Sequence, residues 1–295
     1  MIALVLRWLS RRSLGLLHAF GGALGWAAYA LSPTYRRRLL AHAGQAGVTA
    51  AQRRAAVTQA GRMVAELPRL WMRPAGETVV PPVQWQGAER IDAALDAGRG
   101  LLLMTPHLGC FEVCAQAYAE RWGARVPVTV MFRPARKPWL RELVEASRTR
   151  PGMSAAPASL AGVRQMMRAL KRGEAVGLLP DQVPPEGMGV WAPFFGRDAY
   201  TMTLAARLAE QTGATVLLMV GERLPAAAGW RVHVQPLPEP LPPGSPADEA
   251  HQVACATVIN RAMEHLIRQW PHQYLWGYQR YKSPRRVRAE VAVAP

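Results

Sequence analysis

From about residue 85 onward the sequence alternates short apolar runs with segments of helical spacing, and this alternation restricts the fold more than any other feature. The strand-like runs cover residues 101–104, 126–132, 175–179, 214–220 and 230–235, and the helical segments cover residues 109–121, 160–170, 203–211 and 247–270. Strands that alternate with helices predict an α/β fold, in which a mostly parallel central sheet is flanked by helices. The Pro- and Gly-rich stretch at residues 182–200 is predicted to be a loop.

The chain has 295 residues, of which 50% are hydrophobic, so it can bury a large core and is not a disordered chain. Its cysteines, Cys110, Cys114 and Cys255, are odd in number and cannot all pair in disulfides. None of them has the spacing of a zinc finger, and we expect neither a metal nor a cofactor.

Positive charge is in large excess, because 36 lysines and arginines stand against 20 aspartates and glutamates, for a net charge of +16. Such a surplus indicates an anionic partner, which is a nucleic acid, an anionic lipid or an acidic protein. The sequence carries no zinc knuckle, basic-leucine heptad or aromatic RNA-binding signature, and this argues against nucleic acid. The basic residues gather instead beside an apolar N-terminal stretch.

That stretch, Ser13–Tyr35, is uncharged and long enough to cross the ~30 Å hydrocarbon core of a bilayer as a helix. It can be a membrane anchor that spans or dips into the bilayer, a cleaved signal sequence, or a buried core helix. Arginines flank it on both sides, and this favours an anchor over residues 1–35 that holds the rest of the chain at the cytoplasmic face. Residues 34–72 are predicted to form a helix that Pro68 interrupts.

His107 follows the apolar run 101–104 in a turn, and Glu112 comes at the start of the next helical segment. Chemistry in open α/β sheets gathers where strands end and helices begin. In one unbroken helix these two side chains would point about 140° apart. Because His107 is predicted to lie in a turn before the helix, the side chain of Glu112 can still reach its imidazole. The pair is a candidate general base with an orienting carboxylate, although a structural histidine and a helix-end acid give the same spacing.

Further motifs follow this His-x4-Glu pair along the chain. They are Phe132-Arg133-Pro134, Lys137-Pro138-Trp139-Leu140, Arg148 with Arg150, Pro180-Asp181-Gln182, Ala192-Pro193-Phe194-Phe195-Gly196, Thr201-Met202-Thr203 and the closing segment Tyr274–Lys282. In this order they resemble the bacterial late acyltransferases of lipid A biosynthesis, within the lysophospholipid-acyltransferase-like superfamily. The resemblance covers residues 1 to about 283.

The resemblance implies an acyltransferase domain at residues 36–283, followed by a basic tail at residues 284–295 that we expect to be disordered. The implied reaction moves a fatty acyl chain from the thioester of acyl carrier protein to a hydroxyl of a lipid A precursor, at the inner membrane. Acyl carrier protein and the glycolipid acceptor are both anionic, which suits the basic chain. The sequence leaves open another acceptor, such as a different glycolipid, a phospholipid or a carrier-linked hydroxyl, and a scaffold that has lost catalysis.

In this reaction His107 is expected to take the proton of the acceptor hydroxyl, while Glu112 orients the imidazole. Backbone N–H groups of residues 108–110 are candidates to bind the oxyanion, whose donors the sequence leaves open. Cys110 is a rival nucleophile, but a small buried residue near a helix start is the simpler interpretation.

The resemblance also implies substrate-binding residues, which are Arg133, Arg148 and Asp181. Asp181 is expected to pair with one of these arginines, to orient the acceptor sugar, or only to cap its loop. The Phe194-Phe195 pair is expected in the core rather than in an acyl channel.

Overall fold

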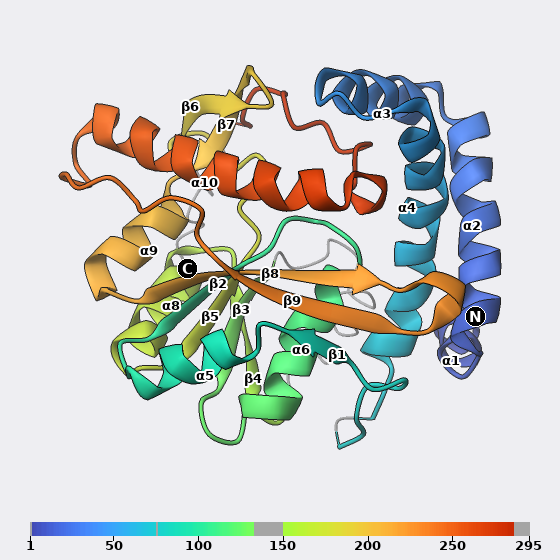
Figure 1. Ribbon diagram of the computed structural model, residues 1–295, viewed down its shortest axis with the longest axis horizontal. Coiled ribbons are helices and arrows are strands. Elements are labelled where there is room, and N and C mark those ends of the chain that lie inside the picture. Colours follow the sequence, from blue (N-terminus) through green and yellow to red (C-terminus); the bar gives the residue numbers. More distant parts are fainter. Residues whose placement is uncertain (1, 75, 133–149, 286–295) are drawn as a thin grey trace, which may run out of the picture.

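The computed structural model describes residues 2–74, 76–132 and 150–285. A seven-stranded sheet forms the centre of the molecule, with the strand order β1-β9-β8-β2-β5-β3-β4 (Figure 1). The strands are β1 (Gln84–Gln86), β2 (Leu101–Met104), β3 (Val128–Phe132), β4 (Met153–Pro157), β5 (Ala175–Leu178), β8 (Thr215–Arg223) and β9 (Trp230–Pro236). All neighbouring strands are parallel except β8 and β9. The predicted α/β fold with a mostly parallel sheet is confirmed.

Helices cover both faces of this sheet, and strand residues alternate between the two apolar clusters that result. Leu101 and Leu103 pack in the cluster of α5 and α6, whereas Leu102 and Met104 pack in that of α8, α9 and α10. A strand buried on both faces carries apolar side chains at every position, which explains the unbroken run of β2. The covering helices are α5 (Glu89–Asp96), α6 (Phe111–Trp122), α8 (Leu160–Lys171), α9 (Leu204–Thr212) and α10 (Glu249–Gln269).

An antiparallel hairpin, β6 (Gly189–Phe194) and β7 (Arg197–Met202), forms a second, two-stranded sheet. The prediction of a loop over residues 182–200 is therefore wrong for most of its length. Proline argues against a strand when the sequence alone is considered, but Pro193 is tolerated because β6 pairs on one side only. The hairpin turns at Phe195 and Gly196, whose backbone is left-handed with φ of 48° and 74°.

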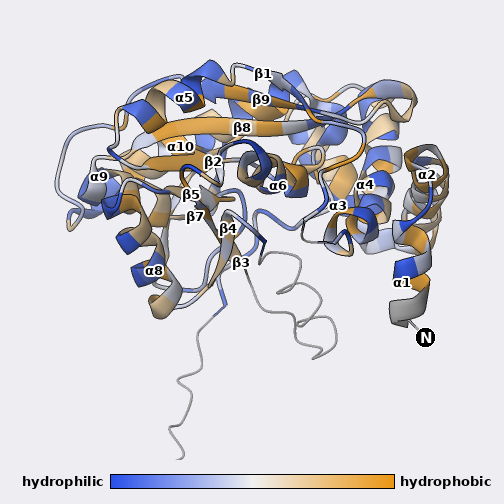
Figure 2. Cartoon of the chain, turned by 90° about the horizontal axis from the view of Figure 1, so that it is seen from below, coloured by the Kyte–Doolittle hydropathy of each residue, from blue (hydrophilic) through white to orange (hydrophobic). Residues whose placement is uncertain are grey.

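Four helices precede the sheet, and the second lies along the fourth (Figure 1). They are α1 (Ile2–Ser10), α2 (Leu14–Leu31), α3 (Pro33–Gln45) and α4 (Ala50–Trp71). Glycine allows α2 and α4 to touch, because a Cβ on Gly61 would lie 1.9 Å from the carbonyl oxygen of Gly21. Within the described part of the chain, only α2 has the length and composition to cross a membrane, and it is strongly apolar in Figure 2.

The single helix predicted over residues 34–72 is two helices, α3 and α4. The chain breaks at Gly47, which has a φ of 74°, and Thr49 then begins α4 with a capping box that includes Gln52. Pro68 does not interrupt α4: the helix continues to Trp71, although Pro68 has no N–H to donate to the carbonyl oxygen of Val64.

Candidate active site

His107 lies in the turn between the end of β2 and the start of α6, where the sequence predicts it. This turn approaches β8 closely: a Cβ on Gly109 would lie 2.2 Å from the carbonyl oxygen of Gly221. Gly109 also has a φ of 60°, so glycine suits both the space and the backbone at this position. The N–H of Cys110 donates to Gly221 at 2.7 Å, and that of Gly109 donates to Gln273 at 3.0 Å. These bonds fix the turn that carries His107.

Asp181 binds His107 at two points. Its Oδ1 lies 2.7 Å from imidazole Nδ1, and its Oδ2 accepts the backbone N–H of His107 at 3.0 Å. The hydroxyl of Tyr274 donates to the same Oδ2 at 3.2 Å. Burial raises the pKa of Asp181, but the charge and hydrogen bonds of His107 outweigh burial, and the pKa lies below its usual value. Asp181 is therefore an ionised carboxylate that holds the imidazole.

The second imidazole nitrogen faces Gln182. The amide Nε2 of Gln182 lies 3.0 Å from Nε2 of His107. An amide N–H can only donate, so the imidazole Nε2 presents its lone pair and the ring proton is on Nδ1, donated to Asp181. A lone pair at Nε2 is the feature that a general base requires.

His107 and Gln182 line a cavity of about 370 Å³. Most of the other lining residues are apolar, among them Met131, Val163, Met188, Met202 and Leu204. An apolar cavity with a few polar groups at one point can hold an alkyl chain beside a reacting group and limit the access of water. The arrangement therefore suits proton transfer next to a lipid chain.

The predicted pair of His107 and Glu112 shares this cavity, but Glu112 does not hold Nδ1. An imidazole Nδ1 carries one hydrogen, and Asp181 accepts it, so the position that fixes the tautomer belongs to Asp181. A catalytic role for Glu112 stays a prediction. Arg133 and Arg148 lie outside the described residues. Asp181 contacts His107, and its expected pairing with one of these arginines or with the acceptor sugar stays a prediction.

The sequence analysis does not single out Gln182 and Tyr274, although both stand inside motifs that it quotes. Gln182 follows Asp181 directly, and Tyr274 begins the closing segment. Their place beside a predicted site residue, in sequence or in a motif, is the signal that could have found them. Phe194 and Phe195 are buried in the core at 2% and 7% exposure, as expected, and they do not line the cavity.

The backbone N–H groups of residues 108–110 all donate to backbone carbonyl oxygens, at 2.7 to 3.0 Å. The expectation that they bind an oxyanion is therefore wrong for this conformation, because none of the three is available. The side-chain amide of Gln182 is a donor on the cavity wall instead.

Cys110 is buried beside Glu66. Burial first, and then the nearby carboxylate, raises the pKa of the Cys110 thiol well above its usual value. Because the thiolate is the nucleophilic form, Cys110 is poorly suited to attack a thioester.

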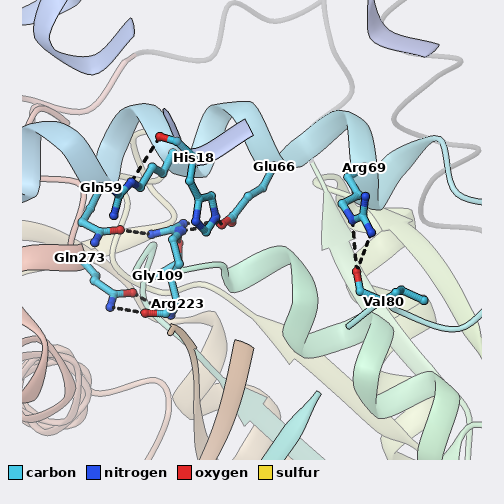
Figure 3. Close-up of polar contacts among 9 residues, drawn as sticks. His18, Gln59, Glu66, Arg69, Val80, Gly109, Arg223 and Gln273 are labelled. Carbon is cyan, nitrogen blue, oxygen red and sulfur yellow. Dashed lines mark hydrogen bonds and ion pairs between the residues drawn. The ribbon is translucent and has the colours of Figure 1, made fainter. Parts of the chain in front are cut away.

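A buried ion-pair network joins the His107 turn to the N-terminal helices (Figure 3). Arg223 of β8 donates to Glu66 of α4 at 2.5 and 3.0 Å, and to the carbonyl oxygen of Gly109 at 3.2 Å. Nε2 of His18, on α2, lies 2.5 Å from the same carboxylate. Burial raises the pKa of Glu66, but Arg223 and His18 outweigh burial and lower it to about 2. The network ties two N-terminal helices to the backbone beside the candidate base.

Among the described residues, Glu210 of α9 and His251 and Cys255 of α10 form the group whose side chains could hold a metal ion. His251 Nε2 lies 2.7 Å from Glu210 Oε1, and the Cys255 thiol donates to the same oxygen at 3.3 Å. The three side chains therefore bond to one another, and none of them lines the His107 cavity.

Comparison with known proteins gives consistent matches. A family model described as bacterial lipid A biosynthesis acyltransferase matches residues 21–283. The lipid A biosynthesis lauroyltransferase of Escherichia coli strain K12 is 30% identical over 198 residues, which cover 67% of this chain and 61% of the relative. The lipid A biosynthesis palmitoleoyltransferase of the same strain is 28% identical over 201 residues, with the same coverage of 67% and 61%. The match thus spans about three fifths of the length of these relatives.

Proposed function

The chain belongs to the bacterial lipid A biosynthesis acyltransferase family, and from this premise we propose that it transfers a fatty acyl chain from the thioester of acyl carrier protein to a hydroxyl of a lipid A precursor. Two relatives are named as lauroyl- and palmitoleoyltransferases of lipid A biosynthesis, which supports both the reaction and the acceptor class. One observation carries the proposal: an imidazole, held at Nδ1 by a buried carboxylate, presents its Nε2 at the wall of an apolar cavity.

In the proposed reaction, the acceptor hydroxyl displaces the Gln182 amide from Nε2 of His107. His107 takes the hydroxyl proton as the oxygen attacks the thioester carbonyl, and Asp181 stabilises the imidazolium that forms. When the tetrahedral intermediate collapses, the carrier thiol leaves with the proton from the imidazolium. A positioned general base contributes ~10²–10⁴-fold in rate, or about 3–5.5 kcal/mol. Glu112 stays in the proposed site because it lines the same cavity.

We also propose that α2 attaches the protein to the inner membrane without crossing it, so that the catalytic domain faces the cytoplasm. One face of α2 exposes Leu16, Phe20 and Leu24 by 51%, 52% and 41%, at the spacing of one helix stripe. Its other face packs on α4, which carries four arginines and Glu66 and is too polar for the hydrocarbon core. An apolar stripe on a helix fixed to a polar partner suits a position in the plane of the interface.

The reaction is tested by incubating the protein with acyl carrier proteins of different chain length and a lipid A precursor, followed by mass spectrometry of the lipid. His107→Ala is expected to lower transfer by roughly 10²–10⁴-fold, because the base is lost. Glu112→Ala is expected to lower it as well. Cys110→Ala is the matched control in the same turn and is expected to keep most of the activity.

Near-full turnover by His107→Ala would contradict the proposed general-base mechanism. An acyl group trapped on Cys110 would instead indicate a mechanism through a covalent acyl-enzyme. A phospholipid that is acylated in place of the lipid A precursor would change the acceptor and leave the His107 mechanism standing. Circular dichroism of each variant shows that the fold is intact.

A further inference from the structure

A second cavity, of about 870 Å³, lies between α1, the end of α4 and the segment that leads to β1. Among the residues that the structure describes, it shares none of its lining with the His107 cavity. Its lining contains a single acidic residue, Glu77, and five arginines, which are Arg7, Arg11, Arg69, Arg73 and Arg150. A cavity with this balance of charge suits an anion.

Part of the positive charge in this cavity is fixed in place without being neutralised. Arg69 donates to the carbonyl oxygen of Val80 at 3.1 Å (Figure 3) and to that of Arg12 at 2.7 Å. A carbonyl oxygen orients a guanidinium but leaves its net charge intact. Arg73, by contrast, pairs with the carboxylate of Glu120 at 2.5 Å. Arg7 and Arg11 are exposed at the rim, where an incoming anion meets them first.

Two buried N–H groups in the lining have no acceptor. Within the part of the chain that the structure covers, Trp71 Nε1 and Arg73 Nε make no hydrogen bond. The side chain of Arg73 is only 8% exposed. Buried donors almost always have a partner in folded proteins. Both atoms are closed to solvent here, so an acceptor from outside the chain reaches them only when the side chains that cover them move aside. A phosphate group offers several acceptor oxygens together with negative charge.

Exposed apolar side chains adjoin the rim of the cavity. α1 supplies Arg7 and ends just before Arg11, and it exposes Val5 and Trp8 by 51% and 54%. Basic groups beside exposed apolar side chains are typical of a protein surface that meets a bilayer at the level of its headgroups. The anion that reaches this cavity most readily is therefore one that is part of a lipid.

We propose that this cavity binds the phosphate group of an anionic lipid headgroup, at a site separate from the His107 cavity. Arg7 and Arg11 contact the phosphate from the rim, and the N–H groups of Trp71 and Arg73 become its inner donors once the side chains that cover them move aside. The acyl chains of the lipid stay in the bilayer beside Val5 and Trp8. This binding needs no acyl donor, so the proposal and the acyl-transfer proposal can fail independently.

The test is flotation of the full chain with phosphatidylcholine vesicles that contain or lack phosphatidic acid, whose headgroup is a phosphomonoester. The wild-type protein is expected to bind more tightly when phosphatidic acid is present. Arg7→Gln combined with Arg11→Gln is expected to weaken that binding roughly 25-fold, since each basic residue near an anionic surface contributes about fivefold. The matched control is Arg164→Gln with Arg168→Gln, an exposed pair of the same spacing on α8, which is expected to bind like wild type.

Trp71→Phe separates a built site from general attraction between charges, because it removes the indole N–H and leaves the net charge unchanged. A several-fold loss of binding with an unchanged melting temperature supports the site. Wild-type binding by a folded Trp71→Phe overturns the proposal, as does an equal loss in the two double arginine variants. If Trp71→Phe does not fold, the double variants decide alone. Inorganic phosphate is the last arm: if it binds as tightly as the phosphatidic acid vesicles and displaces them, the ligand is free phosphate and the lipid assignment is wrong.

Discussion

Each polar neighbour of His107 controls a different property of the imidazole. Asp181 accepts the Nδ1 proton at 2.7 Å and fixes the tautomer, while Tyr274 donates to Asp181 and fixes that carboxylate in turn. Gln182 occupies Nε2, the atom that the acceptor hydroxyl needs. In the proposed reaction Gln182 is therefore the neighbour that moves when the acceptor binds, and a substitution of Gln182 acts directly on Nε2 of His107.

Gln182→Glu is expected to move the acidic limb of the pH–rate profile to higher pH. A carboxylate in place of the amide, 3.0 Å from Nε2, would stabilise the imidazolium, so a larger fraction of the enzyme would carry a protonated imidazole at a given pH. Because a protonated imidazole cannot accept a proton, activity then needs a higher pH. The measurement is kcat/KM against pH, which reports the free enzyme.

Gln182→Ala is the control for this measurement, since it removes the contact and adds no charge. Its acidic limb is expected to stay close to that of the wild type. An acidic limb that does not move in Gln182→Glu would show that Nε2 of His107 is not the atom that accepts the proton.

At the scale of elements, the strands buried on both faces are the ones that the sequence predicts well. β2, β5 and β8 are central in the sheet. β2 and β5 therefore consist of apolar residues and glycine, and β8 carries the apolar run 216–220. β4, with the sequence MSAAP, is an edge strand made of small residues and proline, and it gives no periodic signal. The hairpin of β6 and β7 is equally hard to predict, because Pro193 lies inside it and a glycine lies in its turn.

The candidate site also has one part that the local sequence predicts and one part that it does not. The position of His107 at the end of β2 can be predicted, because it depends on one strand and the turn after it. The contact with Asp181 depends on strand order: β5 is the neighbour of β2, so the residues that follow both strands meet at one edge. Strand order is a property of the whole sheet and cannot be inferred from local spacing. Local spacing instead indicates Glu112, the carboxylate nearer to His107 in the sequence, as its partner.

The apolar stripe of α2 is expected to carry most of the attachment to membranes. Phe20→Gln with Leu24→Gln places two amides where half-exposed apolar side chains would enter the bilayer, and is expected to cost about 2 kcal/mol, or roughly 30-fold in partition. The measurement is sedimentation with vesicles of phosphatidylcholine alone, which leaves the basic cavity out of the comparison. Leu160→Gln, at an apolar position on α8 that is 67% exposed, is the control. Equal sedimentation of the wild type and the α2 variant would place the attachment elsewhere.

At the scale of the whole molecule, the N-terminal helices and the sheet form one folded body. Glu66 joins them, since it is 0% exposed and binds both His18 of α2 and Arg223 of β8. A domain boundary at residue 35 stays a prediction, but a cut there would remove His18 from a buried carboxylate. The apolar stripe, the basic cavity and the His107 turn therefore keep fixed positions relative to one another, as a lipid enzyme that works at a surface requires.

Acid is expected to weaken this body through Glu66. Its pKa is about 2 in the folded protein against 4.5 ordinarily, so its stabilising contribution is complete above about pH 4.5 and is lost as the pH falls toward 2. The difference corresponds to about 3 kcal/mol in the free energy of unfolding, which urea titrations between neutral and acidic pH measure directly.

Glu66→Gln is expected to be less stable at neutral pH by about 3–5 kcal/mol, because Arg223 keeps a buried charge without its partner, and to lose most of the acid dependence. Glu239→Gln, which breaks a largely exposed pair with Arg261, is the control and is expected to change stability by about 1 kcal/mol or less. An acid dependence in Glu66→Gln as steep as that of the wild type would assign the acid sensitivity to other carboxylates.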